Sequence, residues 1–296
     1  MTRLRLAASA VAVAASVAVS AASGAGPSGG TIVFSATSAT VPVEQLYSVT
    51  TSGAGLKQLT TGRFSSAAPA FSPNGRRIAF ERNGVGILAM NVDGSGLRRL
   101  TTNPRDSFPA WSPDGRQIVF ARAAGSRWEP YIVPATGGRP RALWKAPPAG
   151  RPTWTTTGLL IASGGDLLKI DTGTGRVLKY YDADVDPIWG LNTVVASPSV
   201  SMLTFVGSRD PIPGDKECGE GACQRFGLYL ENLLSSKKAP RLIVKDGGPA
   251  GFAPDGKRLV YAVRGKLFIR SVATGATTLV PTRTAVPAYT GPPTWH

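Results

Sequence analysis

The chain has 296 residues, and its 33 Lys and Arg outnumber its 18 Asp and Glu, for a formal net charge of +15. Its hydrophobic content of 42% is ordinary for a globular protein with a sizeable core and excludes an intrinsically disordered chain. The charge favours an anionic partner, although it is equally compatible with a role in solubility alone, and the export pattern described next argues against nucleic acid.

Residues 1 to about 22 have the pattern of a secretory signal peptide. Arg3 and Arg5 form a basic start, the run from Leu6 to Val19 is apolar, and small residues suited to cleavage follow. The apolar run is too short for an ordinary membrane-spanning helix, although an uncleaved anchor is the alternative. Residues 23–30 form a Gly/Ser-rich linker. We therefore expect a Sec-exported chain in the periplasm, in the cell envelope or outside the cell, without a transmembrane span in its mature part.

A five-residue sequence motif recurs along the remainder of the chain. It stands at Phe71–Gly75, Trp111–Gly115 and Phe252–Gly256, with fainter copies that begin at Trp154 and Ala196. Its Pro, its Asp or Asn and its Gly are typical of a tight turn, and each sharp copy precedes a short apolar strand. Most copies are 40 to 43 residues apart, which is the size of one four-stranded propeller blade.

The two ends of residues 31–296 complement each other. The chain ends on Pro293-Thr294-Trp295, which matches the first strand of another repeat at Pro152-Thr153-Trp154. The first repeat lacks such a strand and begins at its second one, over residues 31–34. Pairing the ends closes the array and removes its exposed edges. The sequence thus predicts one all-β domain, a six-bladed β-propeller of four-stranded antiparallel blades.

These repeats resemble the TolB-type β-propeller repeat, a bacterial relative of the WD repeat. The sharpest matches are residues 109–120 and 90–101, and the resemblance spans about residues 31 to 296. It implies a propeller fold and a tendency to bind partners. TolB itself also carries a separate N-terminal α/β domain, for which this sequence offers no room.

One repeat interval is longer than the others, and we assign the excess to a loop between Ser208 and Arg225. It contains the only two cysteines, Cys218 and Cys223. In an exported chain an even pair at this spacing predicts a local disulfide. Half of a metal site is the alternative, but the sequence offers no further soft ligands.

Catalytic and metal sites have little support in the sequence. His296 is the only imidazole, and no Gly-x-Ser-x-Gly elbow is present, so a Ser-His-Asp hydrolase is not expected. Asp182, Asp184 and Asp186 alternate like the start of a calcium loop, but Pro187 stands where that loop needs Gly. We expect no cofactor and no enzymatic activity, with calcium at this aspartate cluster as the weak alternative.

The recurring aromatic residues, among them Trp111 and Trp154, occupy one position in each repeat. An array buries equivalent positions equivalently, so we expect them to pack between blades rather than to stack on a ligand. Residues outside the repeat pattern are better binding candidates, because loops on a rigid scaffold usually carry binding sites. The following are assigned to the face with the blade-to-blade connections: Arg63, Arg105, Arg127, Trp128, Arg151, Trp189 and Arg209.

Three of these arginines, Arg63, Arg105 and Arg151, precede successive first strands and are candidates for a ring at one mouth of the central channel. Guanidinium groups there suit carboxylates or phosphates, whereas solvated loop arginines are the alternative. We expect a non-catalytic scaffold that binds a cell-envelope or extracellular protein through this face. A carbohydrate- or anionic-polymer-binding module is the second hypothesis, and a metal-dependent glycan-processing enzyme is the third.

Overall fold

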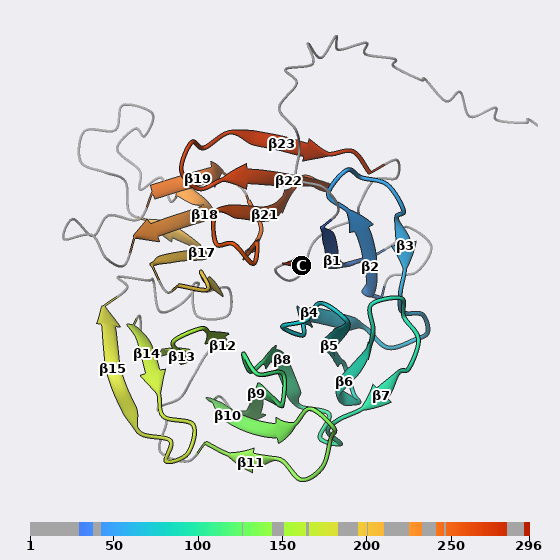
Figure 1. Cartoon of the computed structure of the whole chain (residues 1–296), viewed down its shortest axis with the longest axis vertical. Helices are drawn as coiled ribbons and strands as arrows, with labels where there is room; N and C mark the ends of the chain where they lie inside the picture. The colour runs from blue at the N-terminus through green and yellow to red at the C-terminus, as the bar shows by residue number, and fades with distance from the viewer. Residues whose placement is uncertain are drawn as a thin grey trace, which may run out of the picture.

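The computed structural model is an all-β ring of six sheets around a central axis (Figure 1). It describes residues 30–37, 43–125, 127–143, 151–163, 166–182, 195–199, 201–209, 225–232, 241–245, 247–282 and 293–296. Within these ranges every regular element is a strand. The predicted fold class, a six-bladed propeller of four-stranded antiparallel blades, is confirmed.

Each blade runs from an inner strand at the channel to an outer strand at the rim, and consecutive strands pair in order. The first two blades consist of β24 (Thr294–Trp295), β1 (Thr31–Ala36), β2 (Gln45–Thr50) and β3 (Lys57–Gln58), then β4 (Ser66–Phe71), β5 (Arg77–Arg82), β6 (Gly86–Asn91) and β7 (Arg98–Arg99). The third and fourth consist of β8 (Asp106–Trp111), β9 (Gln117–Ala124), β10 (Arg127–Pro134) and β11 (Arg141–Ala142), then β12 (Pro152–Thr155), β13 (Gly158–Ser163), β14 (Asp166–Ile170) and β15 (Val177–Asp182). The last two consist of β16 (Val195–Ala196), β17 (Met202–Arg209), β18 (Arg225–Asn232) and β19 (Arg241–Lys245), then β20 (Ala250–Phe252), β21 (Arg258–Val263), β22 (Lys266–Ser271) and β23 (Thr277–Val280).

The ring closes as the sequence predicts, by pairing of β24 with β1. Ile32 lies opposite Trp295, and Val33 lies opposite Thr294. Thr31 and His296 extend the pairing, since each backbone N–H donates to the other residue's carbonyl, at 2.7 and 3.0 Å. The first blade is therefore completed by the last strand, and no inner strand is missing from it.

The recurring five-residue motif forms the turn between the first and second strands of a blade. In the third blade Gly115 N–H donates to the Ser112 carbonyl at 2.9 Å, and Ser112 Oγ donates to Asp114 Oδ1 at 2.6 Å. Gly115 has a φ of +69°, which glycine adopts without strain. The second blade repeats the geometry with Ser72 and Asn74. These turns define one face of the ring, called the turn face below.

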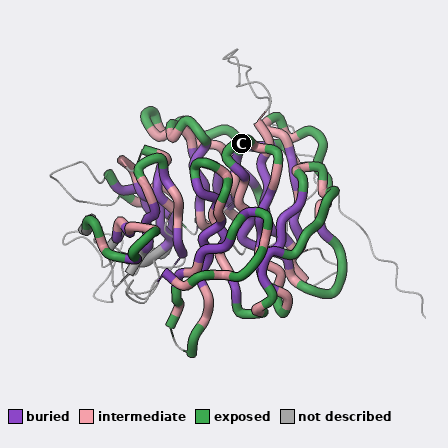
Figure 2. The backbone as a smooth tube through the Cα atoms, turned by 60° about the horizontal axis from the view of Figure 1, so that its bottom comes forward, coloured by how far each residue is buried: buried purple, intermediate pink, exposed green. Residues whose placement is uncertain are grey.

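The core is divided into clusters between neighbouring blades. Figure 2 shows the buried stretches of the chain in purple. Trp111, for example, is 6% exposed and packs with Ala79 and Ile87 of the preceding blade. The aromatic positions of the other repeats also belong to such clusters, Trp154, Phe252 and Trp295 among them. The expected packing of these aromatics between blades is therefore confirmed, although the same residues also line the central channel.

The inner strands β4 and β8 share an irregularity that shapes the channel. Pairing shifts between Ala67 and Ala70, and again between Ser107 and Ala110. Ala68 and Phe108, which lie inside these shifts, have φ of +48° and +56°, an unusual conformation for residues other than glycine. A proline follows each of them. The bulge turns the backbone N–H of Phe108 away from its strand ladder, toward the Glu81 carboxylate of the preceding blade.

Candidate functional site

The face opposite the turn face carries the connections between blades and the turns between second and third strands. It is called the connection face below. Arg63, Arg105 and Arg127 are all exposed on it. Arg63 lies over the ring of its neighbour Phe64, with 5.0 Å between its Cζ atom and the ring centroid. Neither Arg63 nor Arg105 is among the residues that line the channel, so the three predicted arginines do not form one ring there.

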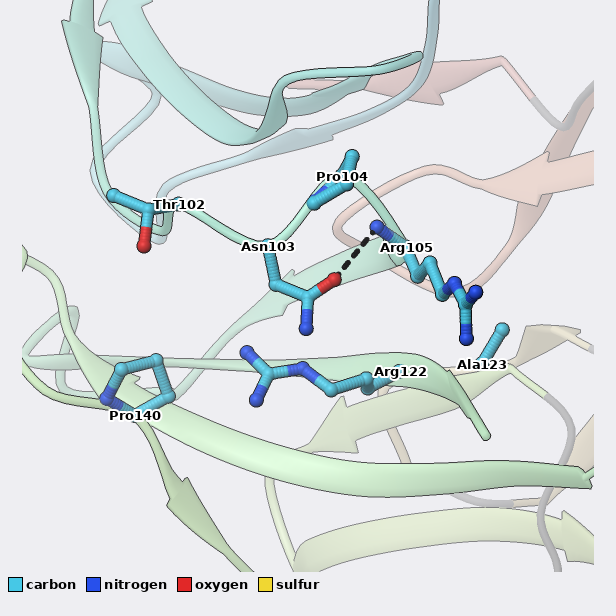
Figure 3. Close-up of a pocket in the computed structure, with 7 residues that line it drawn as sticks. All are labelled: Thr102, Asn103, Pro104, Arg105, Arg122, Ala123 and Pro140. Carbon is cyan, nitrogen blue, oxygen red and sulfur yellow. Dashed lines mark hydrogen bonds between the residues drawn. The ribbon is translucent and has the colours of Figure 1, made fainter. Parts of the chain in front are cut away.

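Arg105 instead lines a pocket of about 590 Å³ on the connection face, between the second and third blades (Figure 3). Arg122 and Ala123 of β9 form one wall, and the connection from Thr102 to Arg105 forms the other. Asn103 Oδ1 accepts the Arg105 backbone N–H at 2.9 Å, which fixes the bend of this connection. Arg105 thus lies in a concave surface, and its role in binding stays a prediction.

The second arginine of this pocket, Arg122, is held by a buried ion pair. Its Nε and Nη2 atoms donate to Asp106 Oδ1 and Oδ2 at 2.6 and 3.0 Å, and the Asp106 side chain is fully buried. The hydrogen bond with Asp106 raises the pKa of Arg122. This two-point pairing neutralises Arg122 and orients its guanidinium group. Among the described residues, no acceptor is bonded to the Arg105 side chain, so its charge is available to a partner.

Aromatic surface lies beside this pocket. Trp128 of β10 stands directly opposite Ala123 across the β9–β10 pair. Its ring packs at a tilt against Phe108, with 5.4 Å between the ring centroids. Both aromatic residues are partly exposed, and Arg127 is the exposed residue next to them. Basic and aromatic groups therefore meet on one stretch of the connection face.

Three carboxylates, Glu44, Glu81 and Asp106, line a smaller pocket of about 180 Å³ near the inner strands β4 and β8, and Arg122 pairs with the last of them. Burial, and then the charge of Glu81, raises the pKa of Glu44 to about 7. Burial also raises the pKa of Glu81, while hydrogen bonds from Phe108 N–H and Ser107 and the charge of Arg151 oppose that rise. Since Glu44 Oε1 is buried without a hydrogen-bond partner, Glu44 is stable there in its protonated form.

The central channel is a cavity of about 410 Å³ lined by all six inner strands and their turns. Its walls are mostly proline, small residues and aromatics, such as Pro109 and Trp154. Arg151 is the only Lys, Arg, Asp or Glu among the described lining residues, and 8% of its surface is exposed. Burial lowers the pKa of Arg151 to about 10, opposed by the charge of Glu81, so the group stays protonated at neutral pH. His296 lies at the turn-face end, where its Nε2 atom is 3.1 Å from the Pro73 carbonyl oxygen.

Several sequence-predicted residues lie outside the described part of the chain: Trp189, Asp184, Asp186, Cys218 and Cys223. Asp182 and Arg209 are described as backbone only, at the ends of β15 and β17. In the chain order the cysteine segment follows β17 and precedes β18, the second and third strands of its blade. Within the described ranges no three His, Cys, Asp or Glu side chains gather as metal ligands would.

Sequence reasoning missed Arg122, Phe108 and Glu81. An alignment of repeats identifies the first, because Arg122–Asp106 and Arg82–Ser66 are the same pair of positions in consecutive repeats, and both pairs are bonded. The same alignment shows that Arg151 corresponds to Phe108 and Ala68, each followed by proline, and not to Arg63 or Arg105. Glu81 has no signal of this kind.

A family model, the TolB beta propeller domain, matches residues 8–157. The chain belongs to this family. A search of curated protein sequences found no match.

Solved structures with the same fold include TolB from Acinetobacter baumannii, at 17% identity and a TM-score of 0.66. The alignment covers 90% of this chain and 66% of that TolB chain. A nidogen/laminin complex aligns at 12% identity and a TM-score of 0.62, over 90% of this chain and 98% of the other. Oligogalacturonate lyase from Vibrio parahaemolyticus aligns at 10% identity and a TM-score of 0.50, over 80% and 70%. At such identities these similarities concern the fold alone.

No described residue belongs to a helix long and apolar enough to cross a membrane.

Proposed function

We propose that this protein is an exported, non-catalytic binding protein that captures a protein partner of the cell envelope through its connection face. The contact surface consists of Arg105, Arg127, Trp128 and Phe108, and is called the third-blade surface below. Membership of the TolB propeller family supports a binding role, since the resemblance carries that expectation with it.

The observation that carries the proposal is the pairing of an available cation with partly exposed aromatics around a concave surface. Arg105 lines the 590 Å³ pocket with its charge unused, while Arg122 in the same pocket is neutralised by Asp106. The Phe108–Trp128 pair stands beside it. Tryptophan and arginine are the residues that most often dominate protein–protein binding energy, particularly when they cluster. The partner surface that fits is acidic, with an apolar patch for the two rings.

Export and the absence of catalysis are part of the proposal. The sequence pattern of residues 1–22 supports Sec-dependent export, and N-terminal sequencing of the secreted form tests it, since cleavage is expected near residue 22. The ring of His296, the only histidine in the sequence, contacts a backbone carbonyl and the Phe71 ring at the turn-face end of the channel. The third-blade surface therefore has no imidazole for acid–base catalysis.

The proposal is tested by quantitative capture of partners from the native envelope fraction. The purified protein is compared with an Arg105→Ala/Trp128→Ala variant and with an Arg76→Ala/Arg116→Ala control, whose residues are exposed on the turn face. We expect a partner that the first variant loses and the control retains. Loss in both variants, or in neither, would overturn the assignment of the surface.

A carbohydrate or an anionic polymer is the second candidate ligand, favoured by the net charge of +15. A glycan array probed with the same three proteins separates it from the first. Glycan binding that depends on Arg105 and Trp128, without any captured protein, would assign the surface to a polymer instead.

A further inference from the structure

Arg151 is a buried cation that the third-blade surface does not use. It precedes the inner strand β12, lines the channel and is 8% exposed. Its Nη1 atom is fully buried, and no acceptor within the described residues bonds to it. A buried charged donor without a partner costs considerable stability, so its presence at a cavity wall favours an acceptor that a ligand supplies.

Glu81 does not supply that acceptor. Its charge is felt by Arg151, but neither a hydrogen bond nor an ion pair joins the two side chains. One Glu81 oxygen, Oε2, accepts the backbone N–H of Phe108 at 2.9 Å. The charge of Glu81 therefore lowers the free-energy cost of burying the Arg151 guanidinium group. It does not occupy the N–H donors of that group.

A second buried donor, on the strand β12 that follows Arg151, points to the same conclusion. Trp154 lines the channel, and its buried Nε1 atom has no hydrogen-bond partner among the described residues. In the preceding repeat the equivalent Trp111 Nε1 donates to the Ala70 carbonyl of its neighbouring blade, at 3.1 Å. A carbonyl of the neighbouring blade can therefore accept a hydrogen bond from an indole at this repeat position. Trp154 of the fourth blade makes no such bond. Two donors three residues apart, Arg151 and Trp154, are thus left for a ligand.

We propose that the central channel binds a monovalent carboxylate, whose oxygens accept hydrogen bonds from the Arg151 guanidinium group, on a ligand with an apolar body. The planar fork of arginine matches a carboxylate at two points. The surrounding prolines and aromatics suit the apolar body. A dianion such as phosphate fits less well, because one cation with Glu81 nearby leaves the second negative charge unpaired in a buried site.

The site goes beyond the proposed function, since it uses another strand and another cavity. The carboxylate belongs either to a free small acid or to a side chain or terminus of the envelope partner. Two arms of one experiment distinguish these sources: titration with a small carboxylate, and partner capture by the same variants.

Benzoate is the probe for the first arm, with the neutral isostere benzamide and inorganic phosphate as comparisons. Binding to the purified full chain is measured by calorimetric titration and by the shift in melting temperature. The variants are Arg151→Met, Arg151→Lys, Trp154→Phe and Glu81→Gln. Arg98→Met, in the exposed outer strand β7, is the control that matches the loss of charge.

We expect benzoate to bind and benzamide and phosphate not to bind. Arg151→Met lowers benzoate affinity by more than about tenfold, because a charge-assisted bond is lost. Arg151→Lys retains part of the affinity, and Trp154→Phe lowers it, because the indole N–H donor is lost. Glu81→Gln raises affinity several-fold, because it removes a negative charge near the site. Arg98→Met has no effect.

For the second arm, partner capture lost in Arg151→Met and retained in Arg98→Met assigns the carboxylate to the partner protein. Benzoate binding without this dependence assigns it to a free acid. The proposal is overturned if Arg151→Met folds, as its circular dichroism reports, and neither benzoate affinity nor capture changes. Equal binding of benzamide, or binding of phosphate alone, contradicts the carboxylate assignment. If Arg151→Met fails to fold, the opposite responses expected of Glu81→Gln and Arg151→Lys decide the question.

Discussion

Trp111 and Ala70 lie on the inner strands of adjacent blades, and the indole Nε1–H of Trp111 donates to the Ala70 carbonyl at 3.1 Å. One side chain of the repeat thereby joins a blade to the one before it, both by packing and by a hydrogen bond. Trp154 occupies the same repeat position without such a bond. The propeller is therefore regular in its backbone and differs from blade to blade in how its polar groups are satisfied.

This difference predicts unequal costs for one substitution at the two sites. Trp111→Phe removes the hydrogen bond to the Ala70 carbonyl, so it lowers the free energy of unfolding by about 1–2 kcal/mol. Trp154→Phe breaks no such bond and costs less. Urea unfolding of both variants measures the difference, and an equal or larger loss at Trp154 contradicts it.

The ion pair between Asp106 and Arg122 predicts a second asymmetry. Arg122→Met leaves the fully buried Asp106 carboxylate without its cation and costs about 3 kcal/mol, whereas Asp106→Asn leaves a partly exposed arginine and costs less. Denaturant unfolding of both variants at one pH measures the difference, and an equal or larger loss in Asp106→Asn contradicts it.

Glu44 gives the protein a pH dependence of its own. In the folded chain it keeps its proton up to a pH of about 7, but in the unfolded chain only up to about 4.5. The folded state binds more protons between these values, so the free energy of unfolding falls as pH rises through that range. Glu44→Gln removes this contribution, which we expect to be about 1 kcal/mol after solvent screening of a half-buried group. The matched variant at exposed Glu129, Glu129→Gln, should leave the pH profile unchanged.

Closure of the ring leaves no room at Gly251. A Cβ atom there would overlap the Pro293 carbonyl oxygen, where β20 lies beside β24. Gly251→Ala therefore separates the closing strand from its neighbour and lowers the free energy of unfolding by about 2–3 kcal/mol. Gly173→Ala, where the added atom meets only an ordinary contact at 3.4 Å, changes it by less than about 0.5 kcal/mol. Thermal unfolding of the two alanine variants is the comparison, and similar melting temperatures would contradict this account of closure.

Repetition explains why the fold could be predicted from the sequence. The five-residue turn motif marks the junction between the first and second strands of each blade. Its spacing shows how many strands lie between two copies. The number of blades and the closure of the ring therefore follow from counting the copies of the motif. The site depends on side-chain direction, which counting does not show. Arg63, Arg105 and Arg151 all precede first strands, but only Arg151 occupies the position before the inner-strand proline and lines the channel.

Two further features of the site depend on contacts between blades rather than on any one repeat. The φ of +56° at Phe108 directs its backbone N–H toward Glu81. Neither the sequence around Phe108 nor the sequence around Glu81 contains a motif that predicts this contact. The pairing of Asp106 with Arg122 is visible only when consecutive repeats are aligned and their equivalent positions compared.

The central claim, that a partner docks on the third-blade surface, is tested most directly by site-specific photo-crosslinking in native cells. A photoreactive residue at Arg127, on the connection face, is compared with one at Arg116, exposed on the turn face. The account predicts a discrete crosslinked adduct from position 127 that disappears in the Trp128→Ala background, and none from position 116. Adducts from position 116 alone, or equal adducts from both, would contradict it.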